Sequence, residues 1–128
     1  MGCLNLPRLQ HLTAVLALLA PGTGHAQDWW QGIWAFDPEW CAVADRIGSV
    51  TPAPIAITET EWLGYENRCL IAQTTALDGA AAVHLQLRCQ SEGNTYDEER
   101  LLMRTDETGL AIWIWFGSSD PVLFLRCE

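Results

Sequence analysis

Residues 81–90, AAVHLQLRCQ, carry the pattern that decides the fold. Apolar and polar side chains alternate along this stretch with a period of two, which is typical of a strand in an antiparallel sheet with one buried face. The residues expected to face inward are Val83, Leu85, Leu87 and Cys89, and those expected to face water are His84, Gln86, Arg88 and Gln90.

Turn residues bound this strand on both sides. Asp78-Gly79 is a strong hairpin signal toward residues 69–77, and Glu92-Gly93-Asn94 forms the turn toward residues 95–105. Further strands are expected at residues 29–36, around Ile55 and Ile57, and at residues 110–116 and 122–127. The chain is therefore predicted to be mainly β, a small antiparallel meander or barrel of six to seven strands.

The length of the turn at residues 92–94 sets the register of the next strand. A three-residue loop places Leu85 opposite Met103, whereas a two-residue loop pairs Arg88 with Glu99. We favour the apolar match, because burying it outweighs a surface ion pair worth roughly 0 to 1 kcal/mol.

One short helix is expected directly after the first strand. Asp37-Pro38-Glu39 supplies an N-cap acceptor, a proline at the first helical position and an acid in the first turn. Apolar residues then recur at helical spacing as far as Ile47, and Gly48 can end the helix. The prediction is a helix over residues 38–47.

The first 26 residues are predicted to be a secretory signal peptide. Arg8 precedes the short apolar run of residues 12–20, and Gly24-His25-Ala26 supplies a cleavage site after Ala26. The run is about half as long as a membrane span requires, and Cys3 precedes it, so no stable membrane anchor is expected after cleavage. The working protein is then a periplasmic or secreted β domain, residues 27–128.

The charge of this domain limits its partners. Loss of Arg8 leaves six arginines against sixteen carboxylates, a net charge near −10. Nucleic acids and anionic membranes select basic surfaces, so neither is an expected partner. A cationic protein is the partner that the charge favours, and the oligomeric state is not indicated.

Four cysteines follow the predicted cleavage site: Cys41, Cys69, Cys89 and Cys127. An even number in a small exported domain predicts two disulfides, with three connectivities possible. We predict Cys41–Cys69, closing the helix onto the sheet, and Cys89–Cys127, which end two similar Leu-Arg-Cys segments. No metal site is expected, because there is no C-x-x-C pair and His84 is the only histidine after the cleavage site.

The sequence offers little for catalysis. His84 lies on the outward face of its strand with no nucleophile nearby in sequence, and the serines fall in turns. We therefore expect neither an enzyme nor a cofactor. The alternative is a weak hydrolase that uses paired carboxylates.

One segment mixes acids with aromatic residues, a composition that can contact a cationic group. The candidate binding residues are Glu59, Glu61, Trp62, Tyr65 and Glu66, in what is expected to be a loop entering a strand. The alternative is that Trp62 and Tyr65 cover the end of a small core.

Trp113 and Trp115 alternate with aliphatic residues and share one face of a predicted strand. If the aliphatic face is the core, the two indoles lie outside and indicate an interface. The equally favoured alternative is a strand that is buried on both faces.

Gly32-x-Trp34 in the first strand, with Arg126 near the end of the last, resembles the signature of calycin barrels, the lipocalins and their relatives. The resemblance implies that Trp34 packs under Arg126 at the closed end of a barrel. The chain departs from the family in its shorter length and in the helix after the first strand.

The size and the predicted export signal are similar to those of small periplasmic barrels that inhibit proteases or lysozymes. Residues 91–96 resemble the serine-glycine-tyrosine loop of some lysozyme inhibitors, which implies binding roles for Ser91 and Tyr96. The expected function is thus non-enzymatic protein binding, with inhibition of a basic secreted or periplasmic enzyme as one form of it. A lipocalin-like carrier of a small ligand is the alternative.

Overall fold

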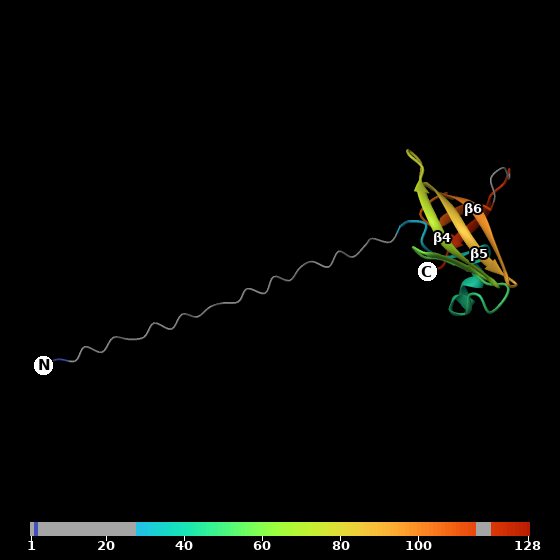
Figure 1. Ribbon diagram of the computed structural model, residues 1–128, viewed down its shortest axis with the longest axis horizontal. Coiled ribbons are helices and arrows are strands. Elements are labelled where there is room, and N and C mark those ends of the chain that lie inside the picture. Colours follow the sequence, from blue (N-terminus) through green and yellow to red (C-terminus); the bar gives the residue numbers. More distant parts are fainter. Residues whose placement is uncertain (1, 3–27, 115–118) are drawn as a thin grey trace.

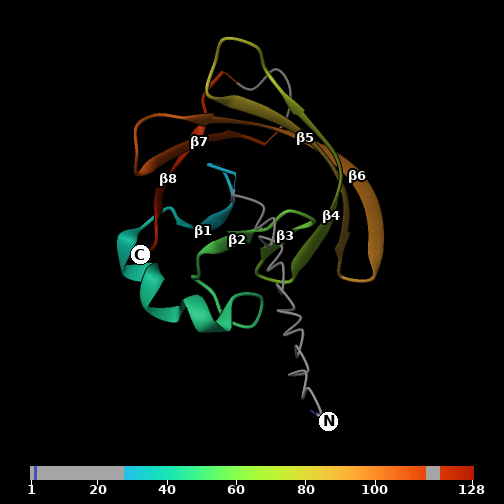
Figure 2. The same cartoon turned by 90° about the vertical axis from the view of Figure 1, so that its left-hand side faces the viewer.

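The computed structural model describes residue 2 and residues 28–114 and 119–128, in which eight antiparallel strands form a closed barrel (Figures 1 and 2). Each strand pairs with the next along the chain, and the last pairs with the first. The elements are β1 (Gly32–Ala35), the helix η1 (Pro38–Arg46), β2 (Ile55–Ile57), β3 (Glu61–Gly64), β4 (Asn67–Ala76), β5 (Ala82–Ser91), β6 (Asn94–Arg104), β7 (Gly109–Trp113) and β8 (Val122–Arg126).

The predicted fold class is confirmed, with a small error in the strand count. The additional strand is β3, which lies in the segment expected to be a loop. It is only four residues long, Glu-Trp-Leu-Gly, and these residues show no clear alternation of polar and apolar side chains. The predicted signal peptide lies outside the described residues except for Gly2.

The alternation in β5 is confirmed. All four residues expected to face inward are buried, and the four alternating with them are exposed or half-buried. The buried core around them comprises Trp30, Trp34, Ile57, Trp62, Cys69, Val83, Leu85, Leu87, Cys89, Leu102, Leu110 and Ile112.

The predicted register between β5 and β6 is wrong. Leu85 lies opposite Arg100 rather than Met103, and Arg88 lies opposite Asp97. The turn consists of Glu92 and Gly93 alone, with φ of 48° and 80°. Positive φ at both central residues matches the type I′ turn, whose twist suits a two-residue hairpin. The turn geometry therefore outweighs the apolar match.

The helix after β1 is present, but it is a 3₁₀ helix with a break at Val43 rather than a regular α-helix. The Asp37 carboxylate accepts a hydrogen bond from the Glu39 N–H at 2.9 Å, as expected of an N-cap. The predicted start is thus correct, and the helix ends at Arg46.

Two disulfides are present, as predicted, but the predicted pairing is wrong. The bonds join Cys41 to Cys127 and Cys69 to Cys89. Cys69 and Cys89 face each other directly across β4 and β5, with Cα atoms 3.9 Å apart. Barrel closure brings the chain end back to β1, where the Cys127 N–H donates to the Ile33 carbonyl, and this places Cys127 beside η1.

These two bonds indicate that the chain folds in an oxidising environment, as exported proteins do. None of the helices in the described ranges is long and apolar enough to cross a membrane.

Arg126 closes one end of the barrel. Its guanidinium carbon lies 4.2 Å from the centre of the Trp34 ring, and its two terminal nitrogens donate to the carbonyls of Gln31 and Trp29 at 2.9 and 2.6 Å. Gly32 adopts φ of 145°, and a Cβ atom there would collide with the Arg126 guanidinium. The glycine, the tryptophan and the arginine therefore form one structural unit.

Candidate functional site

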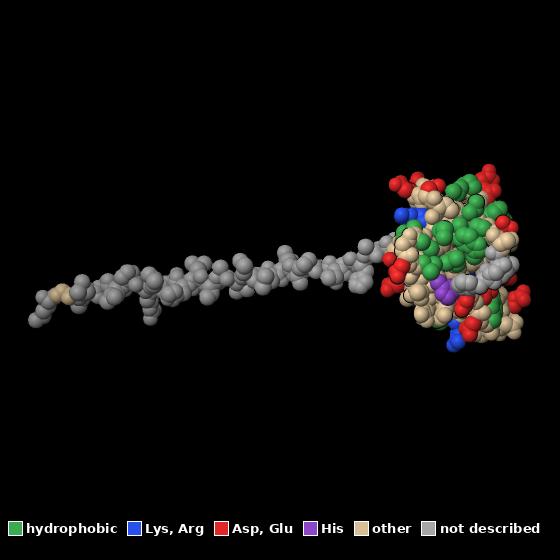
Figure 3. All heavy atoms as spheres, turned by 90° about the horizontal axis from the view of Figure 1, so that it is seen from above, with side chains coloured by type: hydrophobic (Ala, Val, Ile, Leu, Met, Phe, Trp, Pro, Cys, Tyr) green, Lys and Arg blue, Asp and Glu red, His purple; other side chains and the backbone are tan. Residues whose placement is uncertain are grey.

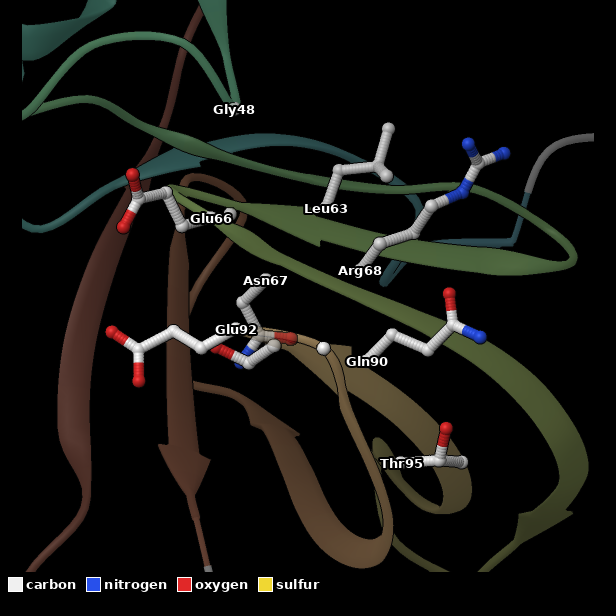
Figure 4. A pocket seen from close by; sticks show the side chains of 11 residues that line it. Gly48, Leu63, Glu66, Asn67, Arg68, Gln90, Glu92 and Thr95 are labelled. Carbon is white, nitrogen blue, oxygen red and sulfur yellow. The ribbon is translucent and has the colours of Figure 1, made fainter.

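A groove of about 480 Å³ lies between the β3–β4 hairpin, the β5–β6 hairpin and Gly48 in the segment after η1 (Figure 4). It is built on two hairpin turns that neighbouring strands bring together. The residues that line it are Gly48, Leu63, Gly64, Glu66, Asn67, Arg68, Gln90, Ser91, Glu92, Gly93 and Thr95.

Both hairpin turns hold a glutamate in an unfavourable backbone conformation. Glu66 and Glu92 each have φ of 48°, in the left-handed region, and no other non-glycine residue in the described ranges has positive φ. The left-handed conformation costs a residue with a Cβ atom roughly 1 to 2 kcal/mol. Figure 4 shows both carboxylates extending to the same side of the groove, with Asn67 between them.

The groove carries uncompensated negative charge. The Arg68 guanidinium is engaged by the Glu61 carboxylate, to which its Nε donates at 2.9 Å. No ion pair involves Glu66 or Glu92 within the described part of the chain. The groove can therefore attract a cationic group, and Asn67, Gln90 and Thr95 offer amide and hydroxyl contacts beside it.

The pKa of the Tyr65 phenol depends on the neighbouring Glu66 carboxylate. The adjacent carboxylate raises the pKa of the Tyr65 phenol, first by charge repulsion of the phenolate and second by accepting a hydrogen bond from the hydroxyl. Tyr65 is 45% exposed, so an aromatic side chain and a carboxylate are presented together beside the groove.

Replacing Glu66 with glutamine is expected to lower the pKa of Tyr65, because the neutral amide removes the charge that disfavours the phenolate. Near-ultraviolet titration of phenolate absorbance can measure this shift. The chain has two tyrosines, so Tyr96 serves as internal reference and Tyr65→Phe assigns the signals. An unchanged Tyr65 pKa in Glu66→Gln would contradict the contact.

The five predicted binding residues do not lie together in one site. Glu66 lines the groove, and Tyr65 precedes it in the same turn. Glu59 lies in the turn before β3, away from the lining residues. Glu61 forms an ion pair with Arg68. Trp62 is 4% exposed and packs in the core under Arg100, so its expected role as a surface anchor is wrong. Alternation along β3 turns Trp62 inward while Glu61 faces out.

The residues suggested by the inhibitor resemblance are only partly at the surface. Ser91 lines the groove. Tyr96 instead packs against the core, and its hydroxyl accepts a hydrogen bond from the Asn67 side-chain amide at 3.2 Å. Tyr96 therefore supports the β3–β4 hairpin from inside the barrel.

A second surface is apolar. Outward positions on β6, β7 and β8 are occupied by Leu101, Met103, Ala111, Trp113, Leu123 and Leu125. Figure 3 shows hydrophobic side chains gathered on this face with carboxylates at its margin. Trp113 is half-buried and Ile112 belongs to the core, so the aliphatic face is the inner one. Trp115 lies outside the described residues.

Glu92 is the acidic residue of the groove that was not predicted from the sequence. The sequence predicted only a turn at this position. One further signal was present, because type I′ turns favour asparagine, aspartate or glycine there and a glutamate is unusual.

No group of three metal-ligating side chains is arranged to hold a metal ion within the described ranges. Carboxylates, amides and hydroxyls are thus what the groove offers a partner.

No protein-family model, curated protein sequence or solved structure gives a significant match to the chain.

Proposed function

We propose that this chain is an exported, non-enzymatic binding protein that captures a basic protein through the groove between Glu66 and Glu92. The observation that carries the proposal is that both left-handed glutamates stand on the two hairpins of one groove. Strained backbone conformations of this kind persist where the surrounding structure holds them in place, and they cluster at binding and catalytic sites.

The two turns would be more stable with other residues. Asparagine or glycine tolerates the left-handed region at little cost, whereas glutamate does not. Glutamate adds a carboxylate on a long side chain, which asparagine lacks. We infer that the carboxylates are retained for contact with a cationic group of the partner, at a cost to the stability of the domain.

Charge and shape together define the partner. The net charge near −10 that remains after loss of Arg8 produces a long-range field that accelerates encounter with a basic protein. At close range, Glu66 and Glu92 are placed to accept hydrogen bonds from an arginine or lysine, with Tyr65 as the adjacent aromatic surface. When that basic group belongs to the active cleft of an enzyme, the bound domain acts as an inhibitor.

The resemblance to calycin barrels supports the same proposal. The stacking of Arg126 on Trp34 is the arrangement that this resemblance implies, and the periplasmic inhibitors that the chain also resembles are small exported barrels. Transport of a small ligand is less favoured, because Trp34, Trp62 and Arg100 occupy the barrel interior.

We place the protein in the periplasm or the extracellular space, because the two disulfides require an oxidising environment.

The test separates stability from binding. Glu92→Asn creates an Asn-Gly type I′ turn, so the free energy of unfolding should rise by about 1 kcal/mol. The same change removes a carboxylate from the groove, so the dissociation constant for the partner should rise by about tenfold. Binding to a panel of lysozymes and basic secreted proteases should be measured at about 0.15 M salt, where distant exposed charges are screened.

Glu107→Gln is the matched control, because it removes an exposed carboxylate in the β6–β7 connection, away from the groove. Its affinity should match that of the unchanged protein. A loss of affinity equal to that of Glu92→Asn would mean that net charge alone drives binding. If Glu92→Asn gains stability and keeps full affinity for a bound panel member, the groove is not the binding site.

A further inference from the structure

We infer, on the basis of the proposed function, that the segment bound in the groove carries an acidic side chain about four residues from its basic one. A second hollow, which adjoins the groove, receives that acid. This hollow has a volume of about 250 Å³ and shares Arg68, Gln90 and Thr95 with the groove. Its other lining residues are Glu61, Leu70 and Arg88.

Strand register places these residues in two rows on the outer face of the barrel. Cys69 and Cys89 belong to the core, so their neighbours in β4 and β5 point outward. The first row, which lines the groove, is Leu63, Arg68, Gln90 and Thr95. The second row is Glu61, Leu70, Arg88 and Asp97. The two hollows are therefore consecutive stretches of one surface.

The sign of the charge reverses from one hollow to the other. Two carboxylates and one guanidinium line the groove: Glu66, Glu92 and Arg68. Two guanidiniums and one carboxylate line the second hollow: Arg68, Arg88 and Glu61. Figure 4 shows Glu66 and Glu92 at one end of the groove and Arg68 toward the other. A segment with a basic group at one end and an acidic group at the other is complementary to this surface.

Both arginines keep donors that their ion pairs do not use. The Arg68 Nε and Nη2 donate to Glu61, and the Arg88 Nε and Nη2 donate to Asp97. Among the described residues, neither Nη1 has an acceptor, and the two side chains are 64% and 63% exposed. Arg68 and Arg88 are diagonal neighbours on adjacent strands, about 7 to 8 Å apart, a spacing that long side chains bridge. One carboxylate of the partner can therefore accept hydrogen bonds from both.

The distance between the two subsites sets the spacing of the charges in the segment. Glu92 follows Arg88 by four residues, which corresponds to roughly 13 Å of strand. An extended segment has the same rise, and its residues i and i+4 face the same side. Leu70 is 55% exposed and lies opposite Arg88, where it can contact the methylene groups of a glutamate. The expected segment is Arg-x-x-x-Glu or Lys-x-x-x-Glu, in either chain direction.

Nuclear magnetic resonance titration with three blocked peptides tests this inference. The peptides are Arg-Ala-Ser-Ala-Glu and the same sequence ending in glutamine or in lysine. The net negative charge of the protein alone favours the glutamine peptide over the glutamate peptide. We expect the reverse: at about 0.15 M salt the glutamate peptide should bind about threefold more tightly than the glutamine peptide. Only the glutamate peptide should shift the amide signals of Leu70 and Arg88.

Arg88→Gln combined with Asp97→Asn removes the second guanidinium without changing the net charge. The preference for glutamate over glutamine should disappear in this double variant. It should persist in Arg104→Gln, the matched control, because that exposed arginine lies outside both hollows. A glutamine peptide that binds the unchanged protein as tightly as the glutamate peptide would overturn the inference. So would a preference for glutamate that survives in the double variant.

Failure of the groove itself gives a different result. Glu92→Asn should weaken all three peptides, because each carries the basic residue. If it does so while glutamate gives no advantage over glutamine, the groove binds the basic group and only the acidic subsite is wrong. If no peptide shifts the amide signals of Glu66 and Glu92 at about 5 mM, the proposed function is contradicted and the acidic subsite with it.

Discussion

Trp62→Ala is expected to unfold most of the protein rather than weaken a binding surface. Trp62 is 4% exposed, and the Arg100 guanidinium carbon lies 4.2 Å from the centre of its ring. Truncating a buried tryptophan costs about 3 to 5 kcal/mol, a large part of the roughly 5 to 15 kcal/mol that stabilises a typical domain. Arg100 adds to this loss, because its side chain is 9% exposed and Glu98 is the one carboxylate that pairs with it among the described residues.

Equilibrium denaturation in urea can measure this loss directly. Tyr65→Ala is the matched control, because Tyr65 is an aromatic residue in the same hairpin but is 45% exposed. Its free energy of unfolding should change by less than about 0.5 kcal/mol. A Trp62→Ala protein with stability close to that of Tyr65→Ala would contradict the packing of Trp62 between the sheet and Arg100.

Removing the Cys41–Cys127 bond should cost more stability than removing the Cys69–Cys89 bond. The first joins residues 86 apart in sequence and the second joins residues 20 apart. In the chain-entropy model these loops correspond to about 4.6 and about 3.3 kcal/mol. The double variants Cys41→Ser with Cys127→Ser, and Cys69→Ser with Cys89→Ser, should differ in that order.

Denaturant unfolding of the two double variants measures the difference, and non-reducing peptide mapping tests the pairing itself. Mapping should recover Cys41 with Cys127 and Cys69 with Cys89. Finding Cys41 joined to Cys69 would restore the pairing expected from sequence and contradict the closure of the barrel. Equal losses in the two double variants would contradict the entropic account while leaving the pairing intact.

The strands were predictable where the alternation was long and clear. In β5, apolar and polar residues alternate without interruption from Val83 to Gln90, so the inner and outer faces follow from the sequence alone. In β3, four residues cannot establish a period, and the same segment supports a loop or a strand. For this reason Trp62 could be placed either at a binding surface or over the end of the core, and its burial follows only when the strand is known.

Contacts between distant segments were not predictable in the same way. The Cys41–Cys127 bond depends on β8 returning to β1, a closure that no local pattern encodes. The groove likewise depends on two hairpins meeting side by side, so Glu66 could be proposed from its composition while Glu92 could not. The register of β6 follows from the backbone of Glu92 and Gly93, whose conformation overrides side-chain matching.

Amide chemical-shift mapping with a bound basic protein tests the central claim most directly. At about 0.15 M salt, the largest shifts should fall on Tyr65, Glu66 and Asn67 and on residues 91–94, the two turns that form the groove. Glu92→Asn should reduce those shifts at equal partner concentration. Shifts concentrated on the outward residues of β6, β7 and β8, with the two turns unaffected, would contradict the proposal that the groove captures the partner.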